Sequence, residues 1–287
     1  MSKQFTPRRS LLYVPGDKEA MLAKATGRGA DGLILNLEDA VAPVNKDAAR
    51  TTVLRVLATL DFSGIEVSVR INPPETEAGQ RDLAAVVPAG PDAIVLPKAG
   101  SVEVVRAAAA TVARLEAAAE LPAGRVRLMC MIESAAGVLA AAQIAACDPR
   151  ISALIFGAND LAEDLGCAPT PGAGLLLHAA CQVVLAARAA GVDAIDTPHM
   201  DIRGAEGLAQ TARLARDLGF AGKSAIHPSQ VAAINAAFAP TAEQIAWAER
   251  VLALIPGDGE DALGVALLDG YLIEAPHIAR ARRILGR

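Results

Sequence analysis

The sequence predicts an α/β protein, a closed (β/α)8 TIM barrel with a C-terminal helical arm. Short apolar segments alternate eight times with longer Ala-rich segments, a pattern typical of parallel strands covered by helices. Eight such units fit the usual barrel length of about 250 residues. The alternative, an open doubly wound sheet, would favour a glycine-rich fingerprint after the first strand. The turn there reads VPGDKEAM and contains no GxGxxG.

The expected strands are short runs that are apolar on both faces. They cover residues 11–15, 32–38, 66–72, 93–98, 127–133, 153–159, 193–198 and 223–228. The expected helices between them are rich in alanine, a strong helix former. They cover residues 17–28, 45–59, 101–119, 135–146, 173–190 and 204–218.

The pattern changes after His227-Pro228, so we expect a barrel domain over 1–237 and an arm over 238–287. Thr241 and Glu243 begin an expected helix over 241–255. The loop PGDGEDALG follows, then a hairpin around Asp269-Gly270 and a helix rich in arginine. We expect this arm to pack on the barrel or on a neighbouring subunit.

The composition excludes several classes of partner. With 53% apolar residues the chain can form a substantial core. Aromatic residues are only 3% and the net charge is −5, which argues against a nucleic-acid partner. No segment has the length of a membrane span or the pattern of a signal peptide. Four cysteines without a CxxC pair fit a cytoplasmic protein.

Chemically capable side chains occur where the expected strands end, which in a barrel is the ligand-binding edge. Each alone could be a helix cap or a structural ion pair. Their convergence on one edge favours a ligand site. The set comprises Glu38, Asp39, Arg70, Asn72, Lys98, Glu133, Asn159, Asp160, Asp196 and His227.

The set is rich in carboxylates and poor in thiols, which suits Mg2+ or Mn2+ and not zinc. Glu133 and Asp160 end neighbouring strands, which lie about 4.8 Å apart in a sheet. Their side chains can therefore reach one ion. This predicts that the two carboxylates bind one divalent cation together.

Two basic residues in this set have competing interpretations. Arg70, inside VSVRIN, could bind a carboxylate or a developing enolate oxygen, or could form an ion pair with Glu38 or Asp39. Lys98 could form a Schiff base with a ketone. An ion pair with a neighbouring carboxylate is the favoured interpretation for Lys98.

Eight segments resemble the citrate lyase β-subunit family of the HpcH/HpaI aldolase superfamily, and in particular its stand-alone malyl-CoA and citramalyl-CoA lyases. They occur in family order over about residues 8–235, and the tail resembles the arm of longer members. The segments are RRSLLYVPGDKEAMLAKA, GLILNLEDAVAPVNKDAAR, VSVRIN, AIVLPKAGS, MIESAAGVLAA, LIFGANDLAEDLG, AIDTPHMDIRG and KSAIHPSQV.

The resemblance implies a Mg2+-dependent carbon–carbon lyase. Its substrate would be a malyl-, citramalyl- or citryl-CoA-like thioester, cleaved by a retro-Claisen or retro-aldol step into an acyl-CoA and a 2-oxo acid. Carried over by position, the metal ligands are Glu133 and Asp160. Arg70 lies beside the thioester and enolate, with Lys98 near the acids.

The resemblance also implies roles for residues around the metal ligands and in the tail. Glu38 and Asp39 would order metal-bound water. Asn159, beside Asp160 at its strand end, is a further candidate to bind substrate. In longer members an arm aspartate reaches the neighbouring subunit's site, but this chain has Glu274 there. Glu274 is therefore a candidate catalytic acid, or simply an acid at a helix start.

The CoA phosphates need basic residues near the barrel mouth, and the candidates are Arg9, Lys18 and Lys24. A solvated helix face explains the lysines equally well. An arm that crosses between subunits requires a symmetric oligomer, expected to be a homo-trimer or homo-hexamer.

Three other functions stay open. The first is a thioesterase or synthase that uses the same enolate site. The second is a non-catalytic CoA-binding subunit of a larger lyase complex, and the third is a metal-dependent aldolase acting on free 2-oxo acids.

Overall fold

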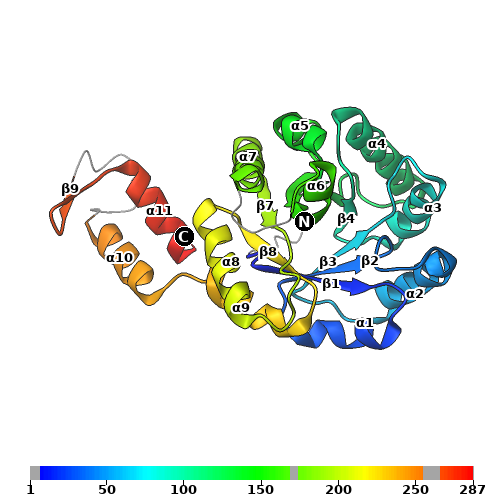
Figure 1. The fold of residues 1–287 in the computed structure, drawn as a ribbon, viewed down its shortest axis with the longest axis horizontal. Coiled ribbons are helices and arrows are strands. Elements are labelled where there is room, and N and C mark those ends of the chain that lie inside the picture. Colours follow the sequence, from blue (N-terminus) through cyan, green and yellow to red (C-terminus); the bar gives the residue numbers. More distant parts are fainter. Residues whose placement is uncertain (1–6, 169–173, 255–265, 287) are drawn as a thin grey trace. The chain divides into compact units, whose positions relative to one another are not determined.

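The computed structural model describes residues 7–168, 174–254 and 266–286. The chain divides into two compact units, residues 1–238 and 239–287, which are described separately. Eight parallel strands of the first unit pair in sequence order and close into a barrel, because β1 also pairs with β8 (Figure 1). This confirms the predicted (β/α)8 barrel and excludes the open doubly wound sheet.

All eight expected strands are present, but most end one to three residues earlier than expected. Their bounds are β1 Ser10–Pro15, β2 Gly32–Asn36, β3 Glu66–Arg70, β4 Ala93–Leu96, β5 Arg127–Ile132, β6 Ile151–Phe156, β7 Asp193–Asp196 and β8 Gly222–Ala225. At the end of β4, Lys98 has φ 51°, a left-handed conformation that cannot continue a strand. The polar residues that follow the strands therefore lie outside the hydrogen-bonded sheet.

Helices connect the strands of the first unit. They are α1 Glu19–Ala25, α2 Lys46–Thr59, α3 Glu77–Val86, α4 Val102–Ala118, α5 Ala135–Ala146, α6 Ala158–Asp164, α7 Gly174–Ala190, α8 Ala205–Leu218 and α9 Pro228–Phe238. Short 3-10 turns occur at Thr26–Arg28, Pro43–Asn45 and Val87–Ala89. Helices α3, α6 and α9 lie where the sequence analysis specified none. Within the described ranges, every helix is too short or too polar to cross a bilayer.

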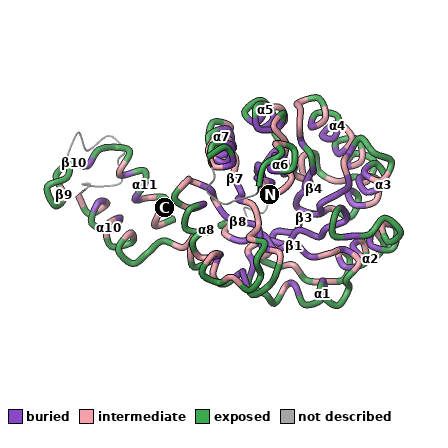
Figure 2. The backbone as a smooth tube through the Cα atoms, in the orientation of Figure 1, coloured by how far each residue is buried: buried purple, intermediate pink, exposed green. Residues whose placement is uncertain are grey.

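The core of this unit has two layers, because alternate residues of each strand face opposite ways. Residues such as Leu11, Ile34 and Ile155 face the barrel interior. Residues such as Leu33 and Leu35 pack outward against the helices. The barrel strands are mostly buried, whereas the outer helix faces are exposed (Figure 2). Burial on both faces explains the near-continuous apolar runs in the sequence.

The second unit contains α10 Ala242–Ala253, a hairpin of β9 Ala266–Leu268 and β10 Tyr271–Ile273, and α11 Ala275–Leu285. Thr241 caps α10 by accepting a hydrogen bond from the Gln244 N–H at 3.2 Å. The hairpin turn has positive φ at both Asp269 and Gly270, as a type I′ turn requires. The expected hairpin is thus confirmed, and α10 covers most of the helix expected over 241–255. The predicted loop over 256–264 lies outside the described residues.

Candidate active site

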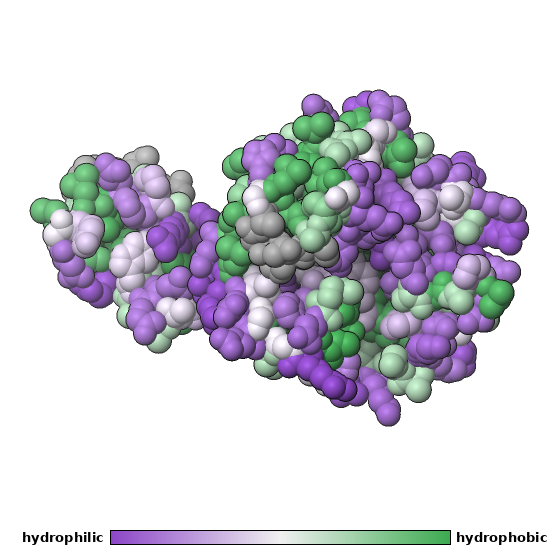
Figure 3. Space-filling model, in the orientation of Figure 1, coloured by the Kyte–Doolittle hydropathy of each residue, from purple (hydrophilic) through white to green (hydrophobic). Residues whose placement is uncertain are grey.

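The carboxyl ends of the barrel strands surround a cavity of about 370 Å3. It combines charged side chains with an apolar floor. Its lining includes Tyr13, Asn36, Asp39, Arg70, Met131, Ile155, Gly157, Asn159, Asp160 and Thr197. On the face of the molecule in Figure 3, hydrophobic residues gather over the region of α7, where Leu175 and Leu185 are exposed.

Arg70 lines this cavity and joins acidic residues at its wall and behind it. Its Nη2 forms a very short ion pair with Glu38 Oε2 and lies 3.3 Å from Asp39 Oδ2. The same nitrogen lies 4.0 Å from Glu133 Oε2. Burial would lower the pKa of Arg70, but Tyr13 and these acids outweigh burial and raise it. The arginine is therefore a fixed positive charge, and the ion pairing with Glu38 or Asp39 considered as its alternative role is present with both acids.

Glu38 is buried, and burial raises its pKa to about 7. Arg70 opposes this rise by stabilising the carboxylate, whereas Asp39 adds to it by charge repulsion. Asn36 and Lys46 hold the backbone here: the Glu38 N–H donates to Asn36 Oδ1, and Lys46 Nζ donates to the Glu38 carbonyl oxygen. Burial therefore makes Glu38 harder to ionise than a free glutamate, although Arg70 lies beside it.

Glu133 follows β5 and is held by the backbone of the neighbouring β4 loop. Its Oε1 accepts a hydrogen bond of 2.6 Å from the Lys98 N–H. Its Oε2 is buried and has no hydrogen-bond partner within the described ranges. Burial raises the pKa of Glu133, Arg70 lowers it, and Asp160 raises it. A buried carboxylate oxygen without a hydrogen bond is costly, so this atom is suited to binding a cation.

Asp160 and Asn159 lie in the first turn of α6, directly after β6. We expected them to end the strand, but the chain becomes helical at Ala158. The Ala158 N–H donates to Thr197 Oγ1 at 3.3 Å, which ties this helix start to the loop after β7. Both residues line the cavity beside the neighbouring β5.

The donor set fits a hard divalent cation. No three His, Cys, Asp or Glu side chains cluster as a metal centre in the parts of the chain that the structure describes. Mg2+ does not need such a cluster, because it keeps several waters and commonly uses one or two carboxylates. Glu133, with its unpartnered oxygen, and the nearby Asp160 match that requirement.

Tyr13 forms part of the cavity floor and was missed in the sequence analysis. Its ring centroid lies 6.0 Å from Arg70 Cζ. Its hydroxyl contacts Met131 Sδ at 3.8 Å. Burial raises its pKa to about 12, although Arg70 opposes the rise. The alternation of side chains along a strand could have predicted that Tyr13 faces the barrel interior, because it is two residues from the inward-facing Leu11.

The predicted CoA-binding residues do not lie together. Arg9 precedes β1 and forms an ion pair of 2.8 Å with Asp31, just before β2. It therefore lies at the amino-terminal end of the barrel, and our expectation that it lies near the mouth is wrong. Lys18 follows the carboxyl end of β1, whereas Lys24 is an exposed residue of the last turn of α1.

Lys98 contributes its backbone and not its ammonium group to this arrangement. Its side chain is exposed. The ion pair favoured in the sequence analysis is absent among the described residues. The lysine backbone instead orients Glu133, a role that residue type alone could not reveal.

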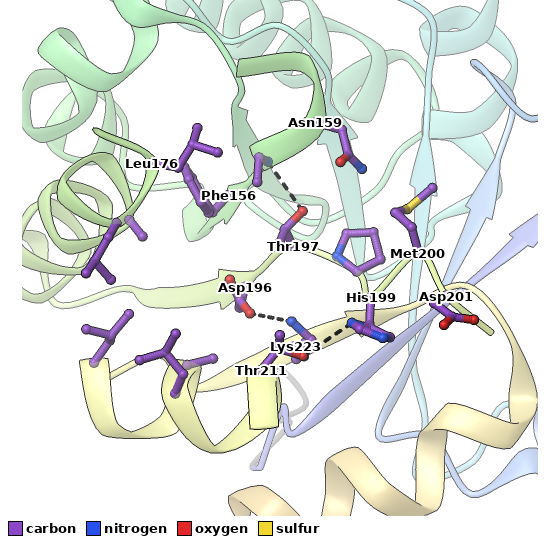
Figure 4. Close-up of a pocket in the computed structure, with 17 residues that line it drawn as sticks. Phe156, Asn159, Leu176, Asp196, Thr197, His199, Met200, Asp201, Thr211 and Lys223 are labelled. Carbon is purple, nitrogen blue, oxygen red and sulfur yellow. Dashed lines mark hydrogen bonds and ion pairs between the residues drawn. The ribbon is translucent and has the colours of Figure 1, made fainter. Parts of the chain in front are cut away.

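A second cavity of about 250 Å3 lies between α7 and α8 and shares Asn159, Thr197 and Met200 with the mouth (Figure 4). At this cavity Lys223 Nζ forms a buried ion pair of 2.6 Å with Asp196 Oδ2. Asp196 faces outward, on the same side of β7 as Ala194 of the outer core. It is therefore separated from the acid cluster inside the mouth, contrary to the expected convergence.

Two further candidate site residues lie at the starts of helices. His227 is exposed before α9, and its Nδ1 lies 2.8 Å from Ser229 Oγ. Glu274 lies in the second unit at the start of α11, and its N–H donates to His277 Nδ1 at 3.1 Å. The position of Glu274 agrees with an acid that begins a helix. Its catalytic role stays a prediction.

A closed parallel barrel with an arginine–carboxylate cluster at its mouth places this protein among the (β/α)8 barrel enzymes. Residues 9–228 match the model of a family described as HpcH/HpaI aldolase/citrate lyase. The chain belongs to this family, which confirms the resemblance seen in the sequence.

Relatives and solved structures agree with this membership. A (3S)-malyl-CoA thioesterase of Cereibacter sphaeroides is 39% identical over all of this chain and 96% of its own length. The citrate lyase subunit beta of Haemophilus influenzae is 37% identical over 98% of this chain and 96% of its own. The crystal structure of CitE from Mycobacterium tuberculosis, with magnesium, acetoacetate and coenzyme A, matches with TM-score 0.79 and 33% identity, covering 98% of each chain.

Proposed function

We propose that the protein is a Mg2+-dependent carbon–carbon lyase of CoA thioesters. The substrate is a malyl-, citramalyl- or citryl-CoA-like thioester, and the products are an acyl-CoA and a 2-oxo acid. The observation that carries this proposal is the unpartnered buried oxygen of Glu133, beside Arg70 and Asp160 in the barrel mouth. The complex of the similar CitE with magnesium, acetoacetate and coenzyme A supports it.

Glu133 and Asp160 would hold the cation. A Mg2+ ion there would polarise the oxygens of the substrate and lower the pKa of its hydroxyl group. Mn2+ would satisfy the same oxygen ligands. The Lys98 N–H fixes one oxygen of Glu133, which leaves the other oxygen, 4.0 Å from Arg70 Nη2, without a hydrogen bond among the described residues.

Arg70 stabilises the negative charge that develops on the thioester oxygen when the carbon–carbon bond breaks. Its ion pair with Glu38 fixes the guanidinium before substrate arrives. Asp39 is the more exposed of the two acids, with 63% of its side chain accessible, so it can bind and order water at the mouth. Asn159, at the cavity wall, donates a hydrogen bond to a substrate oxygen or accepts one from the substrate hydroxyl.

The substrate hydroxyl would give its proton to water ordered by Asp39 as the carbon–carbon bond breaks, and the nascent carbanion must then gain a proton. We propose Glu274, supplied by the arm of a neighbouring subunit, as the acid. This requires a homo-oligomer, and a trimer or hexamer is our expectation. Lys18, at the carboxyl end of β1, is the better placed of the two lysines proposed for CoA.

The test combines metal binding with product analysis. Asp160→Asn removes the charge of one proposed ligand but keeps its shape. We expect the Mg2+ affinity measured by calorimetry to fall about 10- to 100-fold. The release of 2-oxo acid from malyl-CoA or citramalyl-CoA should fall with it.

Glu163→Gln is the matched control, since Glu163 is an exposed acid of the same helix. It should bind Mg2+ like the unaltered protein. Equal Mg2+ affinity in Asp160→Asn and the unaltered protein would contradict the proposed metal site. Cleavage of aldol adducts of free 2-oxo acids, in the absence of CoA, would favour the aldolase alternative.

A thioesterase is the second candidate, and one observation favours it. The (3S)-malyl-CoA thioesterase of Cereibacter sphaeroides is similar to this chain over its whole length. The same assay separates the two functions by their products. A lyase releases acetyl-CoA or propionyl-CoA, whereas a thioesterase releases free CoA. CoA binding without either product, together with copurifying chains, would indicate a non-catalytic subunit.

A further inference from the structure

The floor of the barrel mouth contains one hydroxyl that the proposed mechanism has not used. Tyr13 faces inward from β1 and packs beside Met131 and the interior core. Its ring lies near the Arg70 guanidinium, with 6.0 Å between Cζ and the ring centroid. Tyr13 therefore lines the same cavity as Arg70, Asp39 and Asp160.

This hydroxyl has a weak partner for its position. Tyr13 is half-buried, and a tyrosine held against a core normally donates its O–H to an oxygen or nitrogen acceptor. In the described part of the chain, the contact of Tyr13 is a methionine sulfur at 3.8 Å, and a thioether is a poor acceptor. Arg70, Glu133, Glu38 and Asp160 all act electrostatically on the hydroxyl. The donor is thus directed into a charged cavity without a strong acceptor of its own.

We propose that the Tyr13 hydroxyl donates a hydrogen bond to the substrate oxygen that becomes negative beside Arg70. This inference rests on the proposed function, and it adds a second donor to the site of charge development. Arg70 supplies the positive charge, and Tyr13 supplies a short-range donor from the floor. The same role applies to an enolate oxygen in a lyase and to the thioester oxyanion in a thioesterase.

The protonation state of Tyr13 suits a donor and not a base. Burial raises its pKa to about 12, so the phenol keeps its proton at every pH at which the enzyme would be assayed. A donor that interacts more strongly with the transition state than with bound substrate changes kcat more than KM. A residue that only fills space would not produce that difference.

Tyr13→Phe tests the proposal, because it removes the hydroxyl and keeps the ring. With Mg2+ and malyl-CoA or citramalyl-CoA, we expect kcat to fall about 10- to 100-fold with KM changed less than about 3-fold. Mg2+ affinity by calorimetry should stay unchanged, since Tyr13 is not a proposed ligand. Tyr271→Phe is the matched control, because Tyr271 is the other tyrosine of the chain and is 76% exposed.

Met131→Leu separates this role from a structural one. If the hydroxyl only served the Met131 sulfur, Met131→Leu and Tyr13→Phe would lower kcat and the melting temperature equally. We expect Met131→Leu to retain most of the turnover. Unchanged kcat in Tyr13→Phe, with an active parent enzyme, would overturn the role of Tyr13 alone. A parent enzyme that neither converts the thioesters nor binds them with Mg2+ would overturn the proposed function and this inference together.

Discussion

The pKa of Glu38 shows how a single buried carboxyl connects stability to the site. Its ordinary value is 4.5, and the fold raises it to about 7 because burial outweighs the attraction of Arg70. The folded protein therefore binds this proton more tightly than the unfolded chain does. The same carboxyl group, when ionised, forms the ion pair that holds Arg70 in the mouth.

This raised pKa predicts how stability depends on pH. The contribution of Glu38 is fully present below pH 4.5 and is lost as the pH rises through about 7. The shift corresponds to a loss on the order of 3 kcal/mol in the free energy of unfolding. Glu38→Gln should reduce this loss, measured by urea unfolding at pH 5 and pH 8 with EDTA present. The same pH dependence in Glu38→Gln and the unaltered protein would show that Glu38 is not responsible.

Residue type alone could predict some of the side chains at the site. The other contacts depend on backbone geometry that the sequence does not show. Glu133, Asp160 and Arg70 could be predicted because each follows or ends a recognisable apolar strand. Lys98 was proposed for its ammonium group, but its backbone N–H makes the contact with Glu133. The positive φ of Lys98 could not be predicted from the sequence pattern. Arg9 was assigned by charge, but it lies at the opposite end of its strand, where Asp31 binds it. Tyr13 was missed because a tyrosine inside an apolar run has the pattern of core.

At the level of elements, the eight strands could be predicted because burial on both faces demands continuous apolar runs. Their ends could not, since departure from the ladder depends on contacts with neighbouring loops. Helix α3 was missed because its short sequence EAGQRDLAAV contains a glycine and closely follows two prolines. Its N-terminus is fixed by Thr76, whose hydroxyl accepts a hydrogen bond from the Gly79 N–H at 3.1 Å.

The junction between β6 and α6 predicts the effect of a small substitution. A Cβ at Gly157 would lie 2.5 Å from Glu133 Cβ and 2.8 Å from Glu133 Oε2. Gly157→Ala should therefore displace Glu133, weaken Mg2+ binding by at least about 10-fold and destabilise the fold by about 1–3 kcal/mol. Calorimetry and urea unfolding measure the two effects.

Gly27→Ala is the control for this junction, because a Cβ there would meet no atom within 4 Å. It should change the free energy of unfolding by no more than about 0.5 kcal/mol. Unchanged Mg2+ affinity in Gly157→Ala would contradict the assignment of Glu133 as a ligand.

At the level of the whole molecule, the chain has two cores. The barrel unit has the two layers described above, and the arm unit has its own cluster that includes Ala248, Val251, Ile273 and Ile278. Glu274 belongs to the arm unit and Asp160 to the barrel unit. If the arm serves a neighbouring subunit, each complete site needs residues from two copies of the chain.

Mixing two inactive variants tests this arrangement. Asp160→Asn lacks the metal ligand and Glu274→Gln lacks the arm acid. If both are inactive alone, equal mixing with subunit exchange should restore about one quarter of the sites when the arm crosses between neighbours. Turnover and light scattering would measure activity and oligomer size. No recovery despite confirmed exchange, or full activity in Glu274→Gln, would contradict the shared site.

The pairing of β1 with β8 also affects how the chain can fold. Ser10 lies opposite Lys223 in this pair, so the last seam of the cylinder joins the two ends of the barrel unit. At the usual pace of synthesis, a ribosome needs roughly ten to forty seconds to make the intervening polypeptide. Throughout that interval the first strand has one unpaired edge, which could bind other strands. Newly made chains should therefore be most prone to aggregation just before residue 222 emerges.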